Sequence, residues 1–582
     1  MDRPIDYGRY EKGRHLNYWE VDRVLQWEVR RTYPGDELAF GVEQLSSFGE
    51  AVGQVVADNS DYVDDHGPEL HTYDEHGEVR NEVRYPAEHR ENEEIAYGHG
   101  IVADSFRAPP GREEPLSKLH NLAMEYLLSY ADGGLTCPVA MTAGVALVLE
   151  KFDDGDLAEV FEGLTARSAE EVVEGAMFLT EKQGGSDVGA TETVARRDDE
   201  GNWRLYGEKW FCSNVDAEAK LVLARREGAP EGTDGLSLFL VPHTVDGEPN
   251  DMLCRRLKDK LGTVSVPTGE VELDGSLGYL VGETERGFKY MTEMLNLERL
   301  SNAVAACAHM GRALLEATVH AANREAFGTT IDQFPLMRED LVDMAVDHEA
   351  ATAYSFEAAR VFAERERTGD DDAYRLMRAL VPVAKYRTGR MAVDTCSYAM
   401  EVLGGNGYVD DFVTNRLLRD AQVLPIWEGT SNILSLDLLR ALDREDAHEP
   451  LLAEIDRRLD AAEHPYLADL AAEVREEYHA LAEEMAALGA GDEEYAQSKA
   501  KRLADHVFEV FTAALLVAEA QQRIDDGDAR KALVAERFVD NYLREGRGIS
   551  DGDRFPLEHF DAVVRFAPVD PEQLHEAVPA DD

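Results

Sequence analysis

Two acidic side chains lie in local sequences that bear on whether a carboxylate could act as a base. Glu428 stands between Trp427 and Gly429, in a short apolar stretch after a helical segment, and Glu298 lies on an amphipathic segment directly before Arg299. A carboxylate in an apolar, closed site has its charged form disfavoured, which makes it a stronger base toward a proton within hydrogen-bond reach. Glu428 could therefore act as a general base, whereas Glu298 taken alone is explained as an ion-pair partner on a helix.

A second candidate is a turn rich in glycine, serine and aspartate. Residues 177–190 read MFLTEKQGGSDVGA, an apolar strand that enters the turn. Glycine lets the backbone approach a ligand closely, and the hydroxyls of Thr180 and Ser186 can donate and accept hydrogen bonds. Taken alone, the segment is explained as well by a plain β-turn. Because the pattern G-x-G-x-x-G does not occur between a strand and a helix, the sequence does not support a Rossmann dinucleotide site.

The charge balance restricts the environment and the partners. The chain has 59 Lys plus Arg against 116 Asp plus Glu, a net charge of −57, and 46 of its basic residues are arginine and 13 lysine. Concentrated salt screens such self-repulsion, because the Debye length falls to about 3 Å near 1 M. Disorder is the competing interpretation, but 44% of the residues are hydrophobic. We therefore expect a folded protein from a halophile, and we expect no nucleic-acid partner because the negative field opposes phosphate binding.

Other composition signals exclude several classes of protein. The five cysteines are far apart, form no C-x-x-C pair, and are interpreted as apolar filler rather than as disulfides or metal ligands. No metal site is predicted. No run approaches the roughly 18 to 20 uninterrupted apolar residues of a membrane span. The first twenty residues are charged and aromatic, without the apolar core of a signal peptide, so we expect a cytoplasmic location and no membrane association.

The elements that must position these residues fall into four expected domains. The first is mainly helical, the second has short apolar runs separated by Gly, Asp and Pro that predict a β domain, the third has long amphipathic helices, and the last is an acidic helical tail. Within the first domain, the polar residues 63–96 are expected to be an irregular surface excursion. The four domains are residues 1–175, 176–287, 288–442 and 443–582.

Individual elements are predicted within these domains. In the tail, residues 446–582 contain 14 basic and 33 acidic residues, and breaks are expected at 489–491 and 525–527. Strands are expected at 203–206, 221–224, 236–241 and 269–273, and helices at 16–31, 116–130, 291–325, 340–366 and 374–403.

Six segments together resemble the acyl-CoA dehydrogenase family. Within 177–190, T-E-K-Q-G-G-S-D is similar to a family signature, and five further segments follow in the family's order between residues 120 and 440. The polar excursion, the segment TCPVAMT at 136–142 and the extra tail resemble the AidB-like branch, whose members are linked to alkylation response. The five further segments are GEKWFCSN (207–214), LERLSNAVAA (297–306), REAFGTTIDQFP (324–335), EVLGGNGYV (401–409) and RDAQVLPIWEGTSNI (419–433).

The resemblance implies a fold, a reaction and a base. The fold is mainly α with a central β-barrel domain: an α domain, a β domain and a four-helix α domain, here with an additional C-terminal helical domain. The reaction is FAD-dependent α,β-desaturation of an acyl-CoA thioester in fatty acid metabolism. Glu428 matches the family's catalytic glutamate and is our first choice, while Glu298 matches the position used by the isovaleryl branch. Arg299 resembles the substrate-site arginine, but a solvated helix charge also explains it.

The resemblance also implies which residues hold FAD and which partners exist. Ser186 is implied in substrate binding as well, and Arg324, Phe327, Glu401, Gly404 and Gly405 are implied to hold the ADP half across a subunit boundary. The cofactor residues are Met177, Leu179, Thr180, Gly185, Ser186, Phe211, Ser213, Arg324, Phe327, Glu401, Gly404, Gly405, Thr430 and Asn432. The implied partners are acyl-CoA, an electron-transferring flavoprotein and further copies of the chain in a dimer or tetramer.

The sequence departs from the family pattern at two positions, and it leaves one alternative function open. Glu401 stands where many members carry glutamine, and Asn296 stands where some carry an acidic side chain. The alternative function is a flavoprotein of alkylation response, like AidB, with weak or no dehydrogenase activity and a nucleic-acid-binding tail. Such a tail needs clustered Lys and Arg. The best patch consists of residues 499–502 with Arg530 and Lys531, and acidic residues surround it, so we favour the dehydrogenase.

Overall fold

The computed structural model describes residues 3–544 and 554–575. The chain forms two compact units. One, called here the barrel unit, comprises residues 39–301, and the other, called here the helical unit, comprises residues 1–38 and 302–582.

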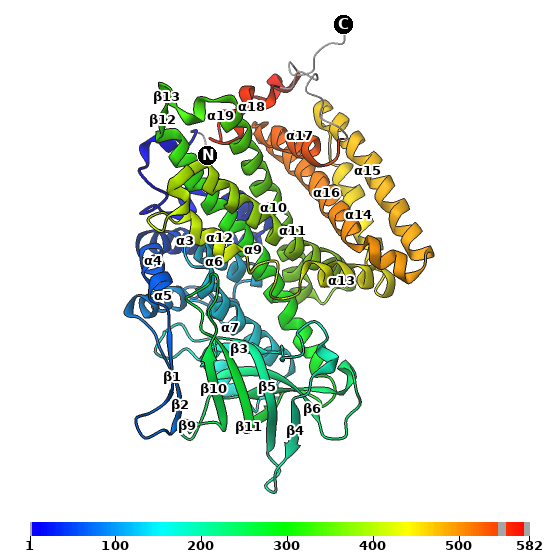
Figure 1. Ribbon diagram of the computed structural model, residues 1–582. Coiled ribbons are helices and arrows are strands. Elements are labelled where there is room, and N and C mark those ends of the chain that lie inside the picture. Colours follow the sequence, from blue (N-terminus) through cyan, green and yellow to red (C-terminus); the bar gives the residue numbers. More distant parts are fainter. Residues whose placement is uncertain (1–2, 545–553, 576–582) are drawn as a thin grey trace. The chain divides into compact units, whose positions relative to one another are not determined.

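The barrel unit contains the predicted β domain. Strands β11, β5, β4, β6 and β7 pair in that order, and β7 also pairs with β11, which closes the sheet into a barrel (Figure 1). Strand β3 pairs with β6, and β10 with β11. The expected strands are confirmed and extended. Their bounds are β3 Gly175–Phe178, β4 Val194–Arg197, β5 Trp203–Ser213, β6 Ala219–Arg226, β7 Leu236–Val241, β8 Thr244–Val245, β9 Glu248–Pro249, β10 Met252–Leu257 and β11 Thr268–Leu280.

Helices of the same unit pack next to the barrel. Helix α7, Gly133–Phe152, contacts β3 and α6. Among the residues that the structure describes, α7 alone is long and apolar enough to cross a membrane by length and composition, but 89% of its apolar window is buried inside the protein. Burial against other protein explains its composition. The other helices are α3 Gly35–Ala51, α4 Ala57–Asp65, α5 Ala87–Gly98, α6 Lys118–Ser129 and α8 Ala158–Leu164, with a π-helical turn at Val52–Val56 between α3 and α4.

The expectation for residues 63–96 is wrong. This segment is a β-hairpin, β1 Glu69–Tyr73 with β2 Val79–Arg84, followed by α5. Asn81 is completely buried; its amide donates to the carbonyl oxygen of Met252 at 2.9 Å and accepts from the backbone amide of Cys254 at 2.9 Å. The polar composition is misleading because side chains of a two-stranded ribbon alternate between its two faces, and the buried Asn81 bonds β10 through its side chain.

The helical unit contains long antiparallel helices. Helices α10 Pro335–Thr368 and α11 Asp371–Leu403 pack together, and α11 also contacts α13 Ser431–Arg444 and α12 Thr414–Ala421. Helix α9, Gly287–Asn323, runs through the boundary at residue 301. In the helical unit, the carbonyl oxygen of His309 on α9 accepts from Cys396 on α11. The three predicted long helices are therefore confirmed.

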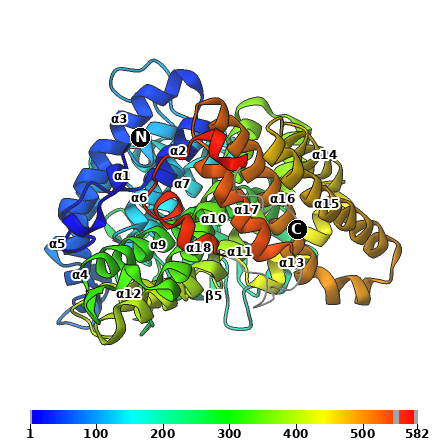
Figure 2. The same cartoon turned by 90° about the horizontal axis from the view of Figure 1, so that it is seen from above.

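The tail adds further helices to this unit. Helices α14 to α17 pack on one another, and α16 also contacts α10, α11 and α13 (Figure 2). The predicted breaks near 490 and 526 are confirmed, and another break after residue 459 was not predicted. The remaining bounds are α1 Tyr18–Val21, α2 Arg23–Thr32, β12 Glu325–Ala326, β13 Thr329–Thr330, α14 His448–Leu459, α15 Pro465–Ala490, α16 Glu493–Asp525, α17 Arg530–Tyr542, α18 Phe555–Glu558 and α19 Phe560–Val563; short 3-10 turns complete the fold.

A buried network of charges connects the helices of the helical unit. Arg31 on α2 contacts Glu357 on α10 at 2.7 Å and Glu519 on α16 at 3.1 Å. Glu519 also contacts Lys531 on α17 at 2.7 Å, and Glu357 contacts Arg458 on α14 at 2.7 Å. Burying a charge is costly unless it is paired, so these contacts fix the register of five helices.

The fold class predicted from the sequence is confirmed: mainly helical, with a β barrel and an additional C-terminal helical domain. The exact four-domain division stays a prediction.

Candidate functional site

The loop that carries Glu428 is held by helix α11. Lys385 is completely buried and donates from Nζ to the carbonyl oxygen of Gly429 at 2.6 Å. Gly389, one helical turn further on, has no side chain, and a Cβ there would lie 3.2 Å from the backbone of Leu424. The helix therefore packs directly on the loop and fixes the residues on both sides of Glu428.

Glu428 itself occupies an unusual backbone conformation. Its φ is +52°, in the left-handed region, and Gly429 follows at +107°. A non-glycine residue with positive φ is uncommon and persists when the surrounding structure enforces it. The side chain of Glu428 is half-buried. Asn302, with its amide oriented by its neighbours, donates to the Leu424 carbonyl at 3.3 Å and accepts from the indole nitrogen of Trp427.

Thr430 and Asn432 lie at the amino end of α13. Thr430 is the N-cap residue, its hydroxyl makes no capping bond, and both side chains are exposed. The first amides of a helix have no partners within the helix and carry a partial positive charge. No acidic residue lies in this first turn. This end of α13 can therefore accept a phosphate together with the Thr430 hydroxyl.

Arg324 and Phe327 belong to a hairpin on the surface of the helical unit. The hairpin is formed by β12 and β13, and Phe327 at its tip is 99% exposed with a φ of +53°. Arg324 is exposed as well. An exposed aromatic ring in a left-handed backbone position is costly for an isolated chain, so this tip is suited to contact with another molecule.

Glu401, Gly404 and Gly405 lie together at the carboxyl end of α11. All three are exposed, and the carbonyl oxygen of Glu401 accepts from the amide of Gly404, which has a φ of +63°. The partial negative charge of a helix end and the Glu401 carboxylate both oppose direct contact with a phosphate. A hydroxyl-bearing part of a ligand suits this position better.

In the barrel unit, the turn after β3 holds the remaining hydroxyl candidates. Met177 is buried within β3, while Leu179 and Thr180 are half-buried and Ser186 is exposed. Gly185 is required here, because a Cβ would lie 2.6 Å from the Thr180 hydroxyl. The backbone carbonyl of Thr180 accepts from Trp210 on β5 at 2.9 Å.

The second barrel strand contributes an aromatic surface. Phe211 on β5 is 57% exposed, and Nζ of Lys258 lies 4.6 Å from its ring centroid and 3.7 Å from that of Trp210. Ser213 ends the strand, with its hydroxyl 3.1 Å from that of Thr268. An exposed ring beside hydroxyl groups can cover the face of a planar ligand.

Glu298 lies inside the barrel unit. It is 5% exposed, and its Oε1 lies 3.2 Å from the position that a Cβ would take at Gly144 on α7. Asn296 is also buried, and Arg299 is half-buried. The carboxyl of Glu298 therefore does not point into solvent, as the ordinary surface ion-pair interpretation requires. The two candidate bases belong to different units, Glu428 to the helical unit and Glu298 to the barrel unit.

Several residues around these candidates were missed in the sequence. Lys385 and Lys209 are completely buried lysines, and Glu181 is a 4% exposed glutamate inside the signature segment. Only the rarity of lysine in this chain could have drawn attention to the first two. Of the five cysteines, Cys137 is partly exposed and the others are buried, and none of them forms a disulfide bond.

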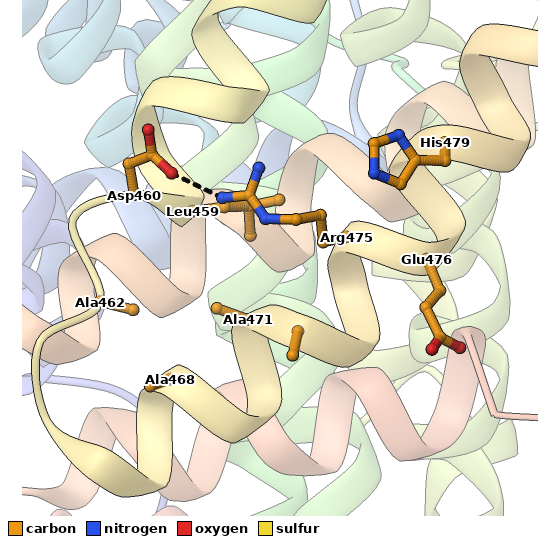
Figure 3. A pocket seen from close by; sticks show the side chains of 9 residues that line it. Leu459, Asp460, Ala462, Ala468, Ala471, Arg475, Glu476 and His479 are labelled. Atoms are coloured by element: carbon orange, nitrogen blue, oxygen red, sulfur yellow. Dashed lines mark hydrogen bonds and ion pairs between the residues drawn. The ribbon is translucent and has the colours of Figure 1, made fainter.

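A hollow in the tail is not part of the candidate site. It measures about 420 Å³ and lies between α14 and α15. Figure 3 shows Arg475 of α15 directed at Asp460, with their ion pair at 2.7 Å, and alanine side chains along the floor. Arg475 and Asp460 pair with each other, and none of the predicted site residues lines the hollow.

The basic patch expected in the tail is smaller than the sequence indicates. Arg530 and Lys531 are 7% and 3% exposed, and both contact Glu349. They belong to the buried network, so the patch reduces to residues 499–502.

Three family models match the chain. Residues 285–442 match the acyl-CoA dehydrogenase C-terminal domain and residues 176–276 the acyl-CoA dehydrogenase middle domain. Residues 10–170 match the adaptive response protein AidB N-terminal domain. Acyl-CoA dehydrogenase family member 11 of Caenorhabditis elegans is 35% identical over 441 residues, which cover 74% of this chain and 71% of that protein. The chain belongs to the acyl-CoA dehydrogenase family.

Other members show how far the likeness extends. Putative acyl-CoA dehydrogenase AidB of Escherichia coli is 34% identical over 413 residues, covering 66% of this acyl-CoA dehydrogenase and 71% of that protein. The crystal structure of C. elegans ACDH-11 in complex with C11-CoA has a TM-score of 0.85 at 30% identity, covering 94% and 95% of the two chains. The Bacillus anthracis acyl-CoA dehydrogenase complexed with FAD has a TM-score of 0.74 at 18% identity, covering 94% and 97%, and supports the fold alone.

The chain is therefore an oxidoreductase of the acyl-CoA dehydrogenase type. The Bacillus anthracis acyl-CoA dehydrogenase is complexed with FAD. The residues present fit this cofactor in two places. The uncapped amino end of α13 with the Thr430 hydroxyl suits a phosphate group, and the exposed ring of Phe211 suits a planar ring system. The assignment of individual residues to the cofactor stays a prediction.

Proposed function

We propose that the protein desaturates an acyl-CoA thioester between its α and β carbons, with Glu428 as the base. When bound, FAD supplies the acceptor for the hydrogen that leaves the β carbon as hydride. Glu428 takes the α proton on a carboxylate oxygen. The single observation that supports this choice is the left-handed backbone at Glu428, which is stabilised by the bond from Lys385 to the carbonyl oxygen of Gly429.

Glu428→Gln tests this role. Glutamine keeps the shape of the side chain but cannot accept the proton, so FAD should remain bound while bleaching of its absorption band by acyl-CoA slows by about 10² to 10⁴. Glu298→Gln is the matched variant. If it abolishes bleaching and Glu428→Gln does not, Glu298 is the base, as the isovaleryl-type arrangement implies. If neither variant slows bleaching, the proposed mechanism is wrong.

The substrate class is best narrowed with a panel of acyl thioesters. Because the ACDH-11 structure contains C11-CoA, the panel includes straight chains of up to that length and longer, together with a branched isovaleryl thioester. The chain length that gives the lowest KM for bleaching identifies the substrate class. The electron acceptor that we propose is an electron-transferring flavoprotein.

We further propose that copies of the chain associate as a dimer or tetramer. The fully exposed ring of Phe327 and the exposed Arg324 beside it support this, because both would be covered by a second copy that shares its FAD site with them. Phe327→Ser should reduce both the oligomer mass in light scattering and the affinity for FAD. A variant that loses neither would argue against a shared site.

An alternative proposal is a flavoprotein of alkylation response. The match of residues 10–170 to the AidB N-terminal domain favours it. Burial of Arg530 and Lys531 weakens its nucleic-acid-binding part. A protein that binds FAD, fails to bleach with any thioester of the panel and retards duplex DNA at physiological salt would support the alternative.

Finally, we propose that the protein works in the cytoplasm of a halophile. The net charge of −57 and the low lysine content support a medium in which salt screens repulsion.

A further inference from the structure

Glu181 is a buried carboxylate of the barrel unit that accepts hydrogen bonds from several groups. Its side chain is 4% exposed. One oxygen accepts from the amide of Thr193 at 3.1 Å, the hydroxyl of the same residue at 2.5 Å and Nζ of Lys209 at 2.8 Å. The other accepts from the amide of Glu192 at 2.7 Å and the side-chain amide of Gln183 at 2.8 Å. Five donors therefore converge on a single side chain.

These bonds join the two ends of one loop. Glu181 stands near the start of the segment between β3 and β4, while Glu192 and Thr193 stand at its end. Within the loop, the backbone of Glu181 exchanges two hydrogen bonds with Gly184, at 3.3 and 3.1 Å. The carboxylate thus closes the loop at its base.

Lys209 connects the closed loop to the barrel. It lies on β5, is completely buried, and also donates to the carbonyl oxygen of Leu223 on β6 at 3.1 Å. Burial raises the pKa of Glu181, but the charge of Lys209 together with the hydrogen bonds from Gln183, Lys209 and Thr193 outweighs burial and lowers that pKa to about 2. The carboxylate is therefore ionised and remains an acceptor on both oxygens.

We propose that Glu181 is the positioning residue of the FAD site, because it holds Thr180 and Ser186 in the loop geometry that the cofactor requires. This inference rests on the proposed function and on the family resemblance, which implies that these two hydroxyls bind FAD. Glu181 does not itself touch the ligand. It acts through the loop, which begins one residue after Thr180 and contains Ser186.

A purely structural role is the competing explanation. In that case Glu181 only neutralises the buried Lys209, since an unpaired buried charge is strongly destabilising. The two roles separate in variants. Glu181→Gln replaces one carboxylate oxygen by an amide nitrogen, which cannot accept from Glu192 and Gln183. The variant also leaves the charge of Lys209 without a counter-charge. The double variant Glu181→Gln/Lys209→Met loses the loop bonds as well but removes the unpaired charge.

The experiment measures the Kd of FAD by fluorescence quenching on titration into the flavin-free full-length chain in concentrated KCl. We expect about a tenfold to hundredfold higher Kd in the double variant, because charge-assisted bonds to the loop are lost. Faster hydrogen exchange at the amides of Glu192 and Thr193 should accompany the loss. The matched control is Glu293→Gln, which removes the 2.8 Å ion pair with Lys151 on the helices of the same unit and should leave the Kd unchanged.

The outcomes separate this inference from the proposed function. If the wild-type chain binds no FAD, the proposed function fails and this inference fails with it. If the wild type binds FAD and the double variant binds it equally well, with wild-type hydrogen exchange at the amides of Glu192 and Thr193, only the positioning role of Glu181 is wrong. Should Glu181→Gln alone not fold, the double variant still decides the question through the same two measurements.

Discussion

At the scale of single residues, burial sets the protonation of a glutamate that the proposed chemistry does not use. Glu125 on α6 is completely buried and accepts a hydrogen bond from the Ser301 hydroxyl. Burial raises the pKa of Glu125 to about 8. The folded state therefore holds this proton more tightly than an unfolded glutamate, whose pKa is about 4.3.

We expect the stability of the protein to fall as pH rises through this range. Because the folded pKa is raised, the stabilising contribution is complete below about pH 4 and is lost as pH rises through the folded value near 8. Glu125→Gln cannot ionise and should lose less stability across pH 5 to 9. Thermal unfolding at constant salt measures this, with the exposed Glu113→Gln as control. Parallel curves for wild type and Glu125→Gln would refute the assignment.

Lys385 gives a second prediction at this scale. Lys385→Met keeps an unbranched side chain that is one atom shorter, and it removes the bond to the Gly429 carbonyl beside Glu428. A misplacement of about 1 Å can cost a hundredfold in rate, so we expect bleaching by acyl-CoA to slow by about tenfold to hundredfold. Stopped-flow absorbance at saturating thioester measures the rate. Lys499→Met, on the half-buried side chain in the tail, is the control and should react like the wild type.

At the scale of elements, the β1–β2 hairpin depends on one buried amide. Asn81 has a φ of +52° and bonds both Met252 and Cys254 of strand β10. Asparagine tolerates the left-handed region better than most residues, so its type matches both the backbone and the bonds.

Asn81→Ala should destabilise the barrel unit by about 2 to 4 kcal/mol, because it leaves a buried amide and a buried carbonyl without their partner and strains the backbone. Chemical unfolding followed by fluorescence measures the change. The exposed hairpin residue Glu75 provides the comparison, since Glu75→Ala should change stability by less than about 0.5 kcal/mol. If the two substitutions changed the free energy of unfolding equally, Asn81 would not stabilise the hairpin.

At the scale of the whole molecule, the acidic surface and the buried charge network respond differently to salt. The net charge is −57, whereas the pairs around Glu357 and Glu519 are buried and screened little. Salt therefore relieves repulsion at the surface without weakening the network.

We expect the Tm to rise as KCl increases from about 0.1 M to about 3 M, because the Debye length falls from about 10 Å to below 3 Å. Calorimetry at fixed pH follows the change. Sorbitol at matched osmolality is the control, because it is excluded from the protein surface but does not screen charges. A Tm that is flat or highest in dilute salt would contradict the halophile proposal.

The sequence determined the fold class and the order of elements because these follow from local patterns. Period-two runs at 203–241 and long amphipathic stretches at 291–403 depend only on neighbours in the chain. The family resemblance followed from six such segments in order. Local composition misled at residues 63–96, where the buried Asn81 bonds a strand that lies 171 residues further along the chain.

Only the tertiary structure decided which charged side chains are buried and what they hold. Glu181 closes a loop by bonds to Thr193 and Lys209, Lys385 supports Glu428, and Arg530 and Lys531 join a buried network instead of a surface patch. These partners lie between 12 residues (Glu181 and Thr193) and 182 residues (Lys531 and Glu349) away in the chain. Burial is a property of the packed fold. The sequence therefore does not show whether a charged residue is solvated by water or paired with another residue.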